Sequence, residues 1–419
     1  MPTFPALRFI PLLLLLASCS QQPVKVAEVT PEPCDCPKAV QLPDKPLPTP
    51  AEEVPAVQPQ TPDYGLLQEV GWEALDALAE DNLSAAWGAW LQSCSTLQNK
   101  PVWQPACQAA ISLTTGGKAP ANPVITAYLK EYFAVYQAKN EDGTDAGLIT
   151  GYYEPLLKGS RFKTDRYRYP LYGKPGDLIT VDLSSLYPEL RHKRVRGRLV
   201  GDRVIPYYER REIEENNPLA GQEILWVDDI IDLFFLQIQG SGLVQLENGE
   251  QVHVGYADQN GQAYNSIGRI LIEQGELSRD KASMQGIKNW ARNNPQKLRD
   301  LLYSNPSYVF FRELPAGLPG PLGALGVPIT AERSVAIDPR YIPLGAPLFL
   351  ATTYPNSSKP LNRMMLAQDT GGAIKGGVRA DFFWGAGAEA GKKAGAMKQQ
   401  GKIWVLLPKD FFKLQTVSK

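Results

Sequence analysis

A proline-rich segment near the N-terminus limits what this chain can fold into. Residues 21–63 contain 11 of the 36 prolines and neither a glycine nor an aromatic residue. Such a segment cannot bury a core, and its prolines hold it extended, at about 3.1 Å per residue and roughly 130 Å at most. We therefore expect residues 19–63 to be a tether and the folded part to begin at about residue 64. The rest of the chain is long enough for about two domains.

The residues before the tether have the features of an export signal. Arg8 precedes a short apolar stretch, residues 9–17, which is too short to cross a bilayer. It leads into Leu16-Ala17-Ser18-Cys19, which resembles a bacterial lipobox, in which residues 1–18 are removed and Cys19 carries lipid. An ordinary secretory signal with an incidental cysteine is the alternative. Ser20 follows the cysteine, and by resemblance to enterobacterial sorting this favours an outer-membrane lipoprotein facing the periplasm of a Gram-negative bacterium.

The other cysteines suggest a disulfide rather than a metal site. In an oxidising compartment Cys94 and Cys107 are a candidate disulfide across a helical segment, with free thiols as the alternative. A zinc site is disfavoured because Cys34-Asp35-Cys36 has the wrong spacing, and because His192 and His253 lie far apart in sequence. We expect no metal and no cofactor.

Charge and composition exclude several classes of protein. With 43 basic and 44 acidic residues the net charge is −1, which provides no bulk attraction for nucleic acid. A hydrophobic share of 43% and a charged share of 21% exclude a polytopic membrane protein and a wholly disordered chain. One basic run could be a solvated loop or a site for an acidic polymer such as a cell-wall glycan with peptide carboxylates. The run comprises Arg191, Lys193, Arg194, Arg196 and Arg198.

Hydrophobic periodicity predicts helices first and strands later. From residue 64 to about 140 two apolar stripes have helical spacing. The stripes consist of Leu83, Trp87, Trp90, Leu91 and Cys94, and of Ile125, Tyr128, Leu129, Tyr132, Phe133 and Tyr136. Short apolar runs up to about residue 260, including 230–238, predict strands, and helical spacing returns over 267–271 and 284–290. After Pro315 the predicted strands cover 333–338, 347–351, 363–368, 378–384 and 402–407, an arrangement typical of a small barrel.

Carboxylates are the main candidates for catalysis, since the chain has only two histidines and no evident cysteine nucleophile. Asp369 ends one predicted strand and Asp381 begins the next, with a glycine-rich loop between them. Alternation places Asp381 on the strand face of Arg379 and Phe383, where partial desolvation and a like-charged neighbour would raise its pKa, as a general acid requires. In the alternative interpretation Asp369 caps a turn and Asp381 pairs with Arg379 or Lys375.

Three other motif interpretations are weak. Asp369-Thr370-Gly371 matches the tripeptide of aspartic proteases, but a single-chain enzyme of that kind needs a second copy. Gly376 is not followed by the Lys-Ser/Thr of a phosphate-binding loop, and Gln239-Gly240-Ser241-Gly242 lacks the first glycine of a nucleophile elbow.

Five ordered segments carry a family resemblance. Residues 369–385 look like the "3D" motif of cell-wall lytic enzymes, with Asp369 and Asp381 as its first and last aspartates. They are preceded by Thr150-Gly151-Tyr152-Tyr153-Glu154-Pro155, and by segments 237–242, 265–268 and 305–311. In this order the segments resemble the membrane-bound lytic murein transglycosylase A family, over most of residues 145–407.

The resemblance implies a fold that is mainly β with α, in which two domains are separated by a groove. A double-psi β-barrel with N-terminal helices would combine residues 64–157 and 315–419, and residues 158–314 would be an inserted β-rich domain. The family's catalytic aspartate falls on Asp381, and Asp369 matches its supporting neighbour. The candidate substrate-binding residues are Tyr152, Tyr153, Glu154, Gln239, Gly240 and Ser241, although aromatic residues in such loops are often only packed.

The resemblance also implies a function in cell-wall turnover. A lytic transglycosylase cleaves the β-1,4 bond between N-acetylmuramic acid and N-acetylglucosamine and closes the muramyl sugar through its own 6-hydroxyl. Asp381 would then serve first as acid and next as base, with Glu154 as the rival carboxylate. Two alternatives stay open: a hydrolytic muramidase, and a non-enzymatic lipoprotein that binds glycan strands and scaffolds other wall enzymes.

Overall fold

The structure is a computed structural model that describes residues 64–415, except 115, 188–189, 191–194 and 280. The predicted export signal (1–18), the tether (19–63) and the lipid anchor Cys19 therefore lie outside the described residues, as do Cys34 and Cys36. Arg191, Lys193 and Arg194 of the basic run also lie outside them. Across the described ranges, no helix has the length and apolar character needed to cross a bilayer.

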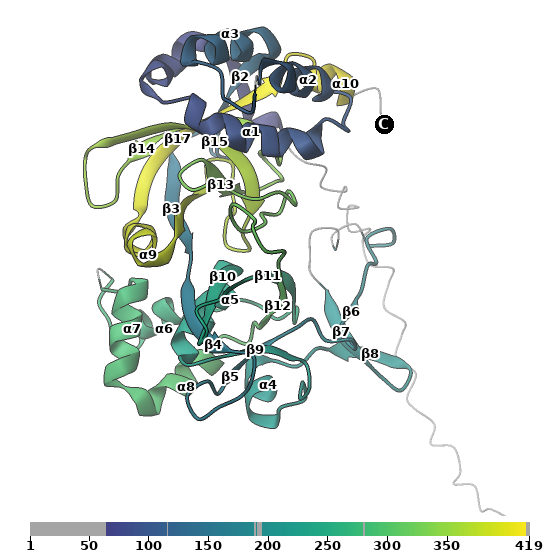
Figure 1. Ribbon diagram of the computed structural model, residues 1–419, viewed down its shortest axis with the longest axis vertical. Coiled ribbons are helices and arrows are strands. Elements are labelled where there is room, and N and C mark those ends of the chain that lie inside the picture. Colours follow the sequence, from purple (N-terminus) through teal and green to yellow (C-terminus); the bar gives the residue numbers. More distant parts are fainter. Residues whose placement is uncertain (1–63, 115, 188–189, 191–194, 280, 416–419) are drawn as a thin grey trace, which may run out of the picture. The chain divides into compact units, whose positions relative to one another are not determined.

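The strands of the described residues form three sheets (Figure 1). In order of neighbours, the eight-stranded sheet contains β1 (Leu67–Val70), β2 (Phe133–Ala138), β17 (Lys398–Pro408), β14 (Pro347–Thr353), β15 (Pro360–Thr370), β13 (Ser334–Ile337), β16 (Ala380–Ala386) and β3 (Gly147–Glu154). The six-stranded sheet contains β12 (Val309–Glu313), β11 (Gln251–Gln259), β10 (Ser241–Leu246), β4 (Leu156–Ser160), β9 (Glu223–Val227) and β5 (Tyr169–Tyr172). The three-stranded sheet contains β6 (Ile179–Thr180), β7 (Arg196–Val200) and β8 (Arg203–Pro206).

Helices precede, interrupt and follow these strands. The N-terminal helices are η1 (Tyr64–Leu66), η2 (Trp72–Glu80), α1 (Ser84–Leu97), α2 (Gln104–Leu113) and α3 (Asn122–Tyr132). The middle of the chain contains α4 (Arg210–Asn216), α5 (Ile230–Gln239), α6 (Ile267–Glu273), α7 (Met284–Asn293) and α8 (Pro295–Tyr303). The C-terminal part contains α9 (Gly387–Ala396) and α10 (Phe411–Gln415).

The eight-stranded sheet closes into a barrel. Strand β17 pairs with β14 on one side and with β3 on the other, which completes a ring of six strands, β17-β14-β15-β13-β16-β3. The ring joins residues 147–154 to strands that begin almost 200 residues later in the chain, at Ser334. The predicted fold class, mainly β with α and containing a small barrel and a second β-rich region, is confirmed. Each predicted strand after Pro315 overlaps one of β13 to β17.

The prediction of a strand over residues 230–238 is wrong, because these residues form helix α5. Asp229 caps the helix, and its Oδ1 accepts hydrogen bonds from the backbone N–H groups of Ile231 and Asp232. Leu233 and Leu236 pack in the core of the six-stranded sheet, whereas Phe234 and Phe235 pack in a core formed with α6, α7 and α8. A helix covered on both sides is apolar around most of its surface, so it loses the periodicity that distinguishes it from a buried strand.

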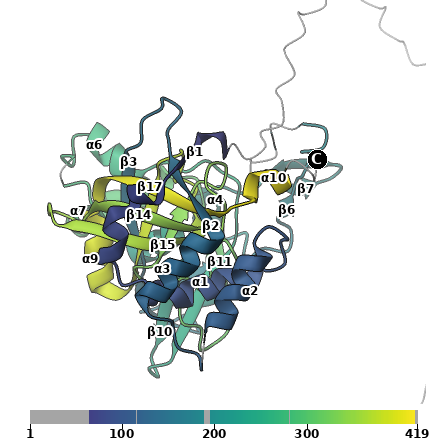
Figure 2. The same cartoon turned by 90° about the horizontal axis from the view of Figure 1, so that it is seen from above.

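The predicted N-terminal helices are present, but α3, which contains the second apolar stripe, ends at Tyr132 and is shorter than predicted. Helices α1, α2 and α3 pack on one another and share the main core with the barrel strands (Figures 1 and 2). Trp90 donates its indole N–H to the hydroxyl of Tyr128, and both side chains are buried. Phe133 and Tyr136, predicted as helical, instead lie on opposite faces of β2, and both are buried. Cys94 in α1 and Cys107 in α2 form a disulfide, the pairing that the sequence favours.

Two arginines of the basic run have partners within the protein. Arg196 in β7 forms an ion pair with the buried Asp258 at 2.9 Å. The guanidinium of Arg198 lies 4.1 Å from the ring centroid of Tyr208. For these two residues the structure favours a packed sheet edge over a site that binds an external anion.

Candidate active site

The two candidate aspartates lie in one row across the barrel strands. Ala336 on β13 is the register partner of Asp369 on β15 and of Asp381 on β16, and Thr150 on β3 is the next partner of Asp381. Side chains of residues opposite one another share a face, so both carboxyl groups are on the same side of the sheet. Two strand spacings separate their Cα atoms, about 10 Å. Asp369 and Asp381 are therefore not on neighbouring strands, because β13 lies between β15 and β16.

Asp381 is a partly buried carboxyl group whose pKa is raised. The Thr150 hydroxyl donates a hydrogen bond to its Oδ1 at 2.6 Å, and Arg379 donates one to the Thr150 hydroxyl at 2.9 Å. Burial raises the pKa of Asp381 to about 6; the charge of Asp369 also raises it, whereas Thr150 and Arg379 lower it. A carboxyl group with this pKa holds a proton for part of the time near neutral pH and can act as an acid.

The predicted strand alternation around Asp381 is present. Ala380, Phe382 and Trp384 pack in the main core, whereas Phe383 packs in a separate small cluster with Tyr152 on the other face. Arg379 donates further hydrogen bonds to the carbonyl oxygens of Leu148 and Ala380.

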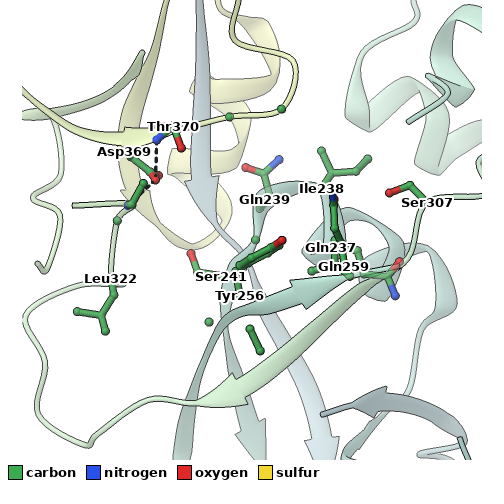
Figure 3. A pocket seen from close by; sticks show the side chains of 18 of the residues that line it. Gln237, Ile238, Gln239, Ser241, Tyr256, Gln259, Ser307, Leu322, Asp369 and Thr370 are labelled. Carbon is green, nitrogen blue, oxygen red and sulfur yellow. Dashed lines mark hydrogen bonds between the residues drawn. The ribbon is translucent and has the colours of Figure 1, made fainter. Parts of the chain in front are cut away.

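Asp369 is held by three hydrogen-bond donors. Its Oδ1 accepts from the backbone N–H of Thr370 at 2.9 Å (Figure 3) and from that of Ala324 at 3.0 Å, and its Oδ2 accepts from the Tyr152 hydroxyl at 3.0 Å. Burial raises the pKa of Asp369, and these three hydrogen bonds oppose the rise. Burial, followed by the charge of Asp369, raises the pKa of Tyr152 well above its usual value, so Tyr152 stays protonated and remains a donor.

A cavity of about 600 Å³ opens beside Asp369. Asp369 and Thr370 border it from the barrel, and Gln239, Ser241 and Tyr256 border it from the six-stranded sheet and the end of α5 (Figure 3). Asp381 does not line this cavity itself; it lies on the same sheet face as Asp369, two strands away. The residue row and the cavity share Asp369, and we take the two together as the candidate site.

The segment 237–242 forms a helix end, a turn and the start of a strand. Gly240 adopts φ +81°, a backbone conformation that favours glycine, and it ends α5 directly before β10 begins at Ser241. This turn places Gln239, Gly240 and Ser241 at the cavity. The side-chain oxygen of Gln239 also accepts a hydrogen bond from the backbone N–H of Tyr153 at 3.1 Å, so the segment is fixed to β3.

Tyr153 and Glu154 lie away from the cavity. The Tyr153 side chain packs in the main core and its hydroxyl donates to the sulfur of Met284 at 3.3 Å. Glu154 is 2% exposed, and its Oε2 lies 3.5 Å from Nε2 of His253. Burial raises the pKa of Glu154 to about 7 and lowers the pKa of His253, so burial favours the neutral form of both groups. Of the six candidate substrate-binding residues, the cavity thus brings together Gln239, Gly240 and Ser241, while Tyr152 reaches the site through Asp369.

Sequence reasoning missed three residues that hold the site together. Thr150 opens one of the recognised segments, but only the barrel pairing shows that its hydroxyl contacts Asp381. Ala324 contributes a backbone N–H, which no side-chain pattern can reveal. Arg210 lines the cavity, is buried, and donates to the Gln237 side chain and to the carbonyl oxygens of Asn305 and Ser307. It thereby joins segments 237–242 and 305–311, although its short helix carries no motif. Among the residues the structure describes, no group of three or more His, Cys, Asp or Glu side chains is placed to hold a metal ion.

Two family models match the chain over most of these elements. A model described as the MltA specific insert domain matches residues 148–312, and one described as the 3D domain matches residues 333–407. The first contains the six-stranded sheet, and the second contains β13 to β17 with both aspartates.

Known proteins are similar over comparable lengths. Membrane-bound lytic murein transglycosylase A of Escherichia coli K12 is 33% identical over 279 residues, which are 65% of this chain and 68% of that protein. The crystal structure of MltA from Neisseria gonorrhoeae is 40% identical with a TM-score of 0.71, covering 82% of this chain and 92% of that one. The structure of E. coli MltA with bound chitohexaose is 25% identical with a TM-score of 0.59, covering 77% and 90%.

Proposed function

The chain belongs to the membrane-bound lytic murein transglycosylase A family and is a peptidoglycan lytic transglycosylase, and from this premise we propose how its residues act. It cleaves the β-1,4 bond between N-acetylmuramic acid and N-acetylglucosamine and leaves 1,6-anhydromuramyl ends. The observation that carries this proposal is Asp381, a protonatable carboxyl group on the same sheet face as the cavity residue Asp369, with a pKa raised to about 6.

Asp381 performs both proton transfers. As the neutral acid it donates its proton to the glycosidic oxygen while the bond from that oxygen to the muramyl C1 breaks. The muramyl 6-hydroxyl oxygen then bonds to C1, and its proton passes to the Asp381 carboxylate, which restores the starting acid. An internal nucleophile has a high effective concentration, so a single carboxyl group suffices where a hydrolase uses two.

Asp369 is a positioning residue in this proposal. Its three hydrogen-bond donors fix its carboxylate, and its negative charge raises the pKa of Asp381. Gln239 and Ser241 offer polar groups to glycan hydroxyls and acetamides along the cavity. Glycan binding is supported by the E. coli relative whose structure contains chitohexaose.

The assignment of Asp381 is tested with two carboxamide variants on murein sacculi. Asp381→Asn keeps the shape and a hydrogen-bond acceptor but cannot exchange a proton, so we expect turnover to fall by about 10³-fold. Glu154→Gln is the matched control, since Glu154 is buried beside His253 and is not in the register row of the two aspartates, and we expect near-normal turnover. Near-normal turnover of Asp381→Asn together with an inactive Glu154→Gln would show that Glu154 is the acid.

Mass spectrometry of the released fragments separates the reaction types. The proposed reaction yields anhydromuropeptides, which are lighter by one water than the products of a hydrolytic muramidase. A preparation that binds sacculi but releases no fragments would instead support a non-enzymatic scaffold for other wall enzymes.

We also propose that Cys19 anchors the protein in the outer membrane and that residues 19–63 form the tether. The E. coli relative is named membrane-bound, which supports an anchored protein. Cys19→Ala should abolish labelling by radioactive palmitate in cells, and Ser20→Asp should move the protein to the inner-membrane fraction. Unchanged labelling of Cys19→Ala would contradict lipid attachment at this residue.

The sheets support the proposed domain limits. Residues 64–157 with 315–419 would be the barrel domain, and 158–314 the inserted domain. All six strands of the second sheet fall between residues 156 and 313, within two residues of these limits.

A further inference from the structure

Three of the described residues that line the cavity are charged. Two of these three already have hydrogen-bond or ion-pair partners within the protein. Arg210 is buried and donates to Gln237 and to two backbone carbonyl oxygens, and it also forms an ion pair with Glu214 at 3.1 Å. Asp369 is held by its three donors. The third charged residue is Arg312.

Arg312 differs from the other two in its surroundings. It lies near the end of β12, is exposed, and has no acidic partner among the described residues. The neighbouring acid Glu313 is paired instead with Arg161. The cavity therefore presents one guanidinium group whose charge the surrounding protein does not neutralise.

Arg312 lies in one register row with two small residues that also line the cavity. Arg312 pairs in register with Gly255 on β11, and Gly255 pairs with Ser241 on β10; all three line the cavity. A Cβ atom on Gly255 would lie 3.0 Å from the Leu314 side chain, so Leu314 packs against this glycine. Arg312 and Ser241 thus face the same cavity from one register row across three neighbouring strands.

We propose that Arg312 binds a carboxylate of the peptide stem attached to a muramyl residue, so that the cavity prefers glycan strands that carry peptides. A guanidinium group has a planar set of N–H donors that matches a carboxylate, whereas the sugar hydroxyls and acetamides are neutral. This inference rests on the proposed function, because it takes a murein glycan as the substrate of the same site.

The test uses three ligands. The first is a murein glycan strand with its stem peptides. The second is the same strand after amidase treatment, which removes the peptides and leaves a carboxylate only on each lactyl group. The third is chitohexaose, which has no carboxylate. Dissociation constants are measured in the Asp381→Asn background, which keeps the strands intact, with and without Arg312→Gln.

We expect Arg312→Gln to weaken binding of peptide-bearing strands about tenfold, because the variant loses one charge-assisted hydrogen-bonded contact and Arg312 is exposed. Binding of stripped strands and of chitohexaose should not change. Arg312→Lys should retain part of the affinity because it keeps the charge. Arg161→Gln, which removes a neighbouring guanidinium that does not line the cavity, should behave as the parent protein.

Three outcomes would overturn the proposal. Equal weakening for all three ligands would mean that Arg312 binds sugar, and weakening for stripped strands alone would mean that it binds the lactyl carboxylate. No weakening for any ligand would mean that Arg312 has no part in recognition. Mass spectrometry of the products of the unmutated enzyme is a separate measurement. If it finds no anhydromuropeptides, the proposed function is contradicted, whereas the role of Arg312 is decided by the binding data alone.

Discussion

At the scale of single residues, the site depends on two aspartates in different environments. Asp369 has three hydrogen-bond donors, two of them backbone N–H groups, which favour its ionised form. Asp381 has a single side-chain donor, Thr150, and burial raises its pKa to about 6. Burial raises the pKa of both carboxyl groups, so the number of hydrogen-bond donors is what distinguishes their environments.

The raised pKa of Asp381 predicts a pH dependence of catalysis. The proposed first step needs the protonated acid, so kcat/KM should decrease as pH rises through about 6. The measurement is the pH profile of kcat/KM on solubilised murein strands. Thr150→Val removes a hydrogen bond that favours the carboxylate, so it should move the descending limb to higher pH. If the descending limb of the Thr150→Val profile does not move, a group other than Asp381 controls the decrease in kcat/KM.

The same pKa shift predicts that Asp381, the proposed catalytic acid, destabilises the fold at neutral pH. Its pKa is about 6 when folded, against an ordinary value of 3.8, so the folded state binds the proton more tightly. The stabilisation that the folded state gains by binding this proton is fully present below about pH 4, and it is lost as the pH rises through about 6. Asp381→Asn should therefore raise the free energy of unfolding at pH 8 by about 3 kcal/mol, and by much less at pH 4.

Urea unfolding at the two pH values measures this difference. Asp410→Asn, at a well-exposed acid near the C-terminus, is the control and should show no such dependence. A variant at Asp381 that is less stable than the unmutated protein at pH 8 would contradict the prediction.

At the scale of elements, local patterns identify helices well where one face is exposed and poorly where both faces are covered. Helix α7 has a polar side and was predicted from Met284, Ile287 and Trp290. Helix α5 is packed between the six-stranded sheet and α6 to α8, and its apolar run resembles a strand. Helix α9 was not predicted at all; it is rich in alanine, glycine and lysine and buries only Ala390 and Ala394.

The disulfide between α1 and α2 offers a prediction at this scale. Its cysteines are 13 residues apart, and closing a loop of this size limits the unfolded chain. Replacing both with alanine should lower the free energy of unfolding by about 3 kcal/mol. Thermal or urea unfolding with and without a reductant provides the measurement: the reductant should destabilise the unmutated protein and leave the double variant unchanged. A double variant as stable as the oxidised protein would show that helix packing alone holds α1 and α2.

At the scale of the whole folded part, a buried ion pair attaches the N-terminal helices to the barrel. Arg333 donates two hydrogen bonds to Asp81, at 2.7 and 3.0 Å, and Asp81 also accepts from the backbone N–H of Met364 in β15. Nearby, the Gln368 amide donates to the carbonyl oxygen of Ala89 and to the Ser93 hydroxyl in α1. Gln368 directly precedes Asp369, so the helices support the strand that carries a site residue.

Removing one partner of this pair should destabilise the whole folded part. Asp81→Ala leaves the buried Arg333 without its counter-charge, for which we expect a loss of about 3–5 kcal/mol. A single cooperative transition that shifts to lower denaturant, read by circular dichroism, would confirm that helices and barrel unfold together. Glu389→Ala breaks an exposed pair with Lys392 and should not measurably change stability. Separate transitions for helices and barrel in Asp81→Ala would contradict the coupling.

The sequence by itself determined the fold class, the strands after Pro315 and the candidate catalytic pair. Strand alternation and glycine-rich turns are local properties, so they can be read from neighbouring residues, and five ordered segments together indicate one family. The Cys94–Cys107 pairing likewise followed from the two cysteines left over in one helical region.

Only the tertiary structure decided which groups meet at the site. Thr150 reaches Asp381 because β3 closes the barrel beside β16, and Ala324 reaches Asp369 through its backbone, which no side-chain pattern encodes. It also places Tyr153 and Glu154 outside the cavity lining and leaves Arg312 facing the cavity with no acidic partner in the part of the chain that the structure describes. Contacts between residues far apart in the chain depend on how strands pair and pack, and a local pattern carries no record of them.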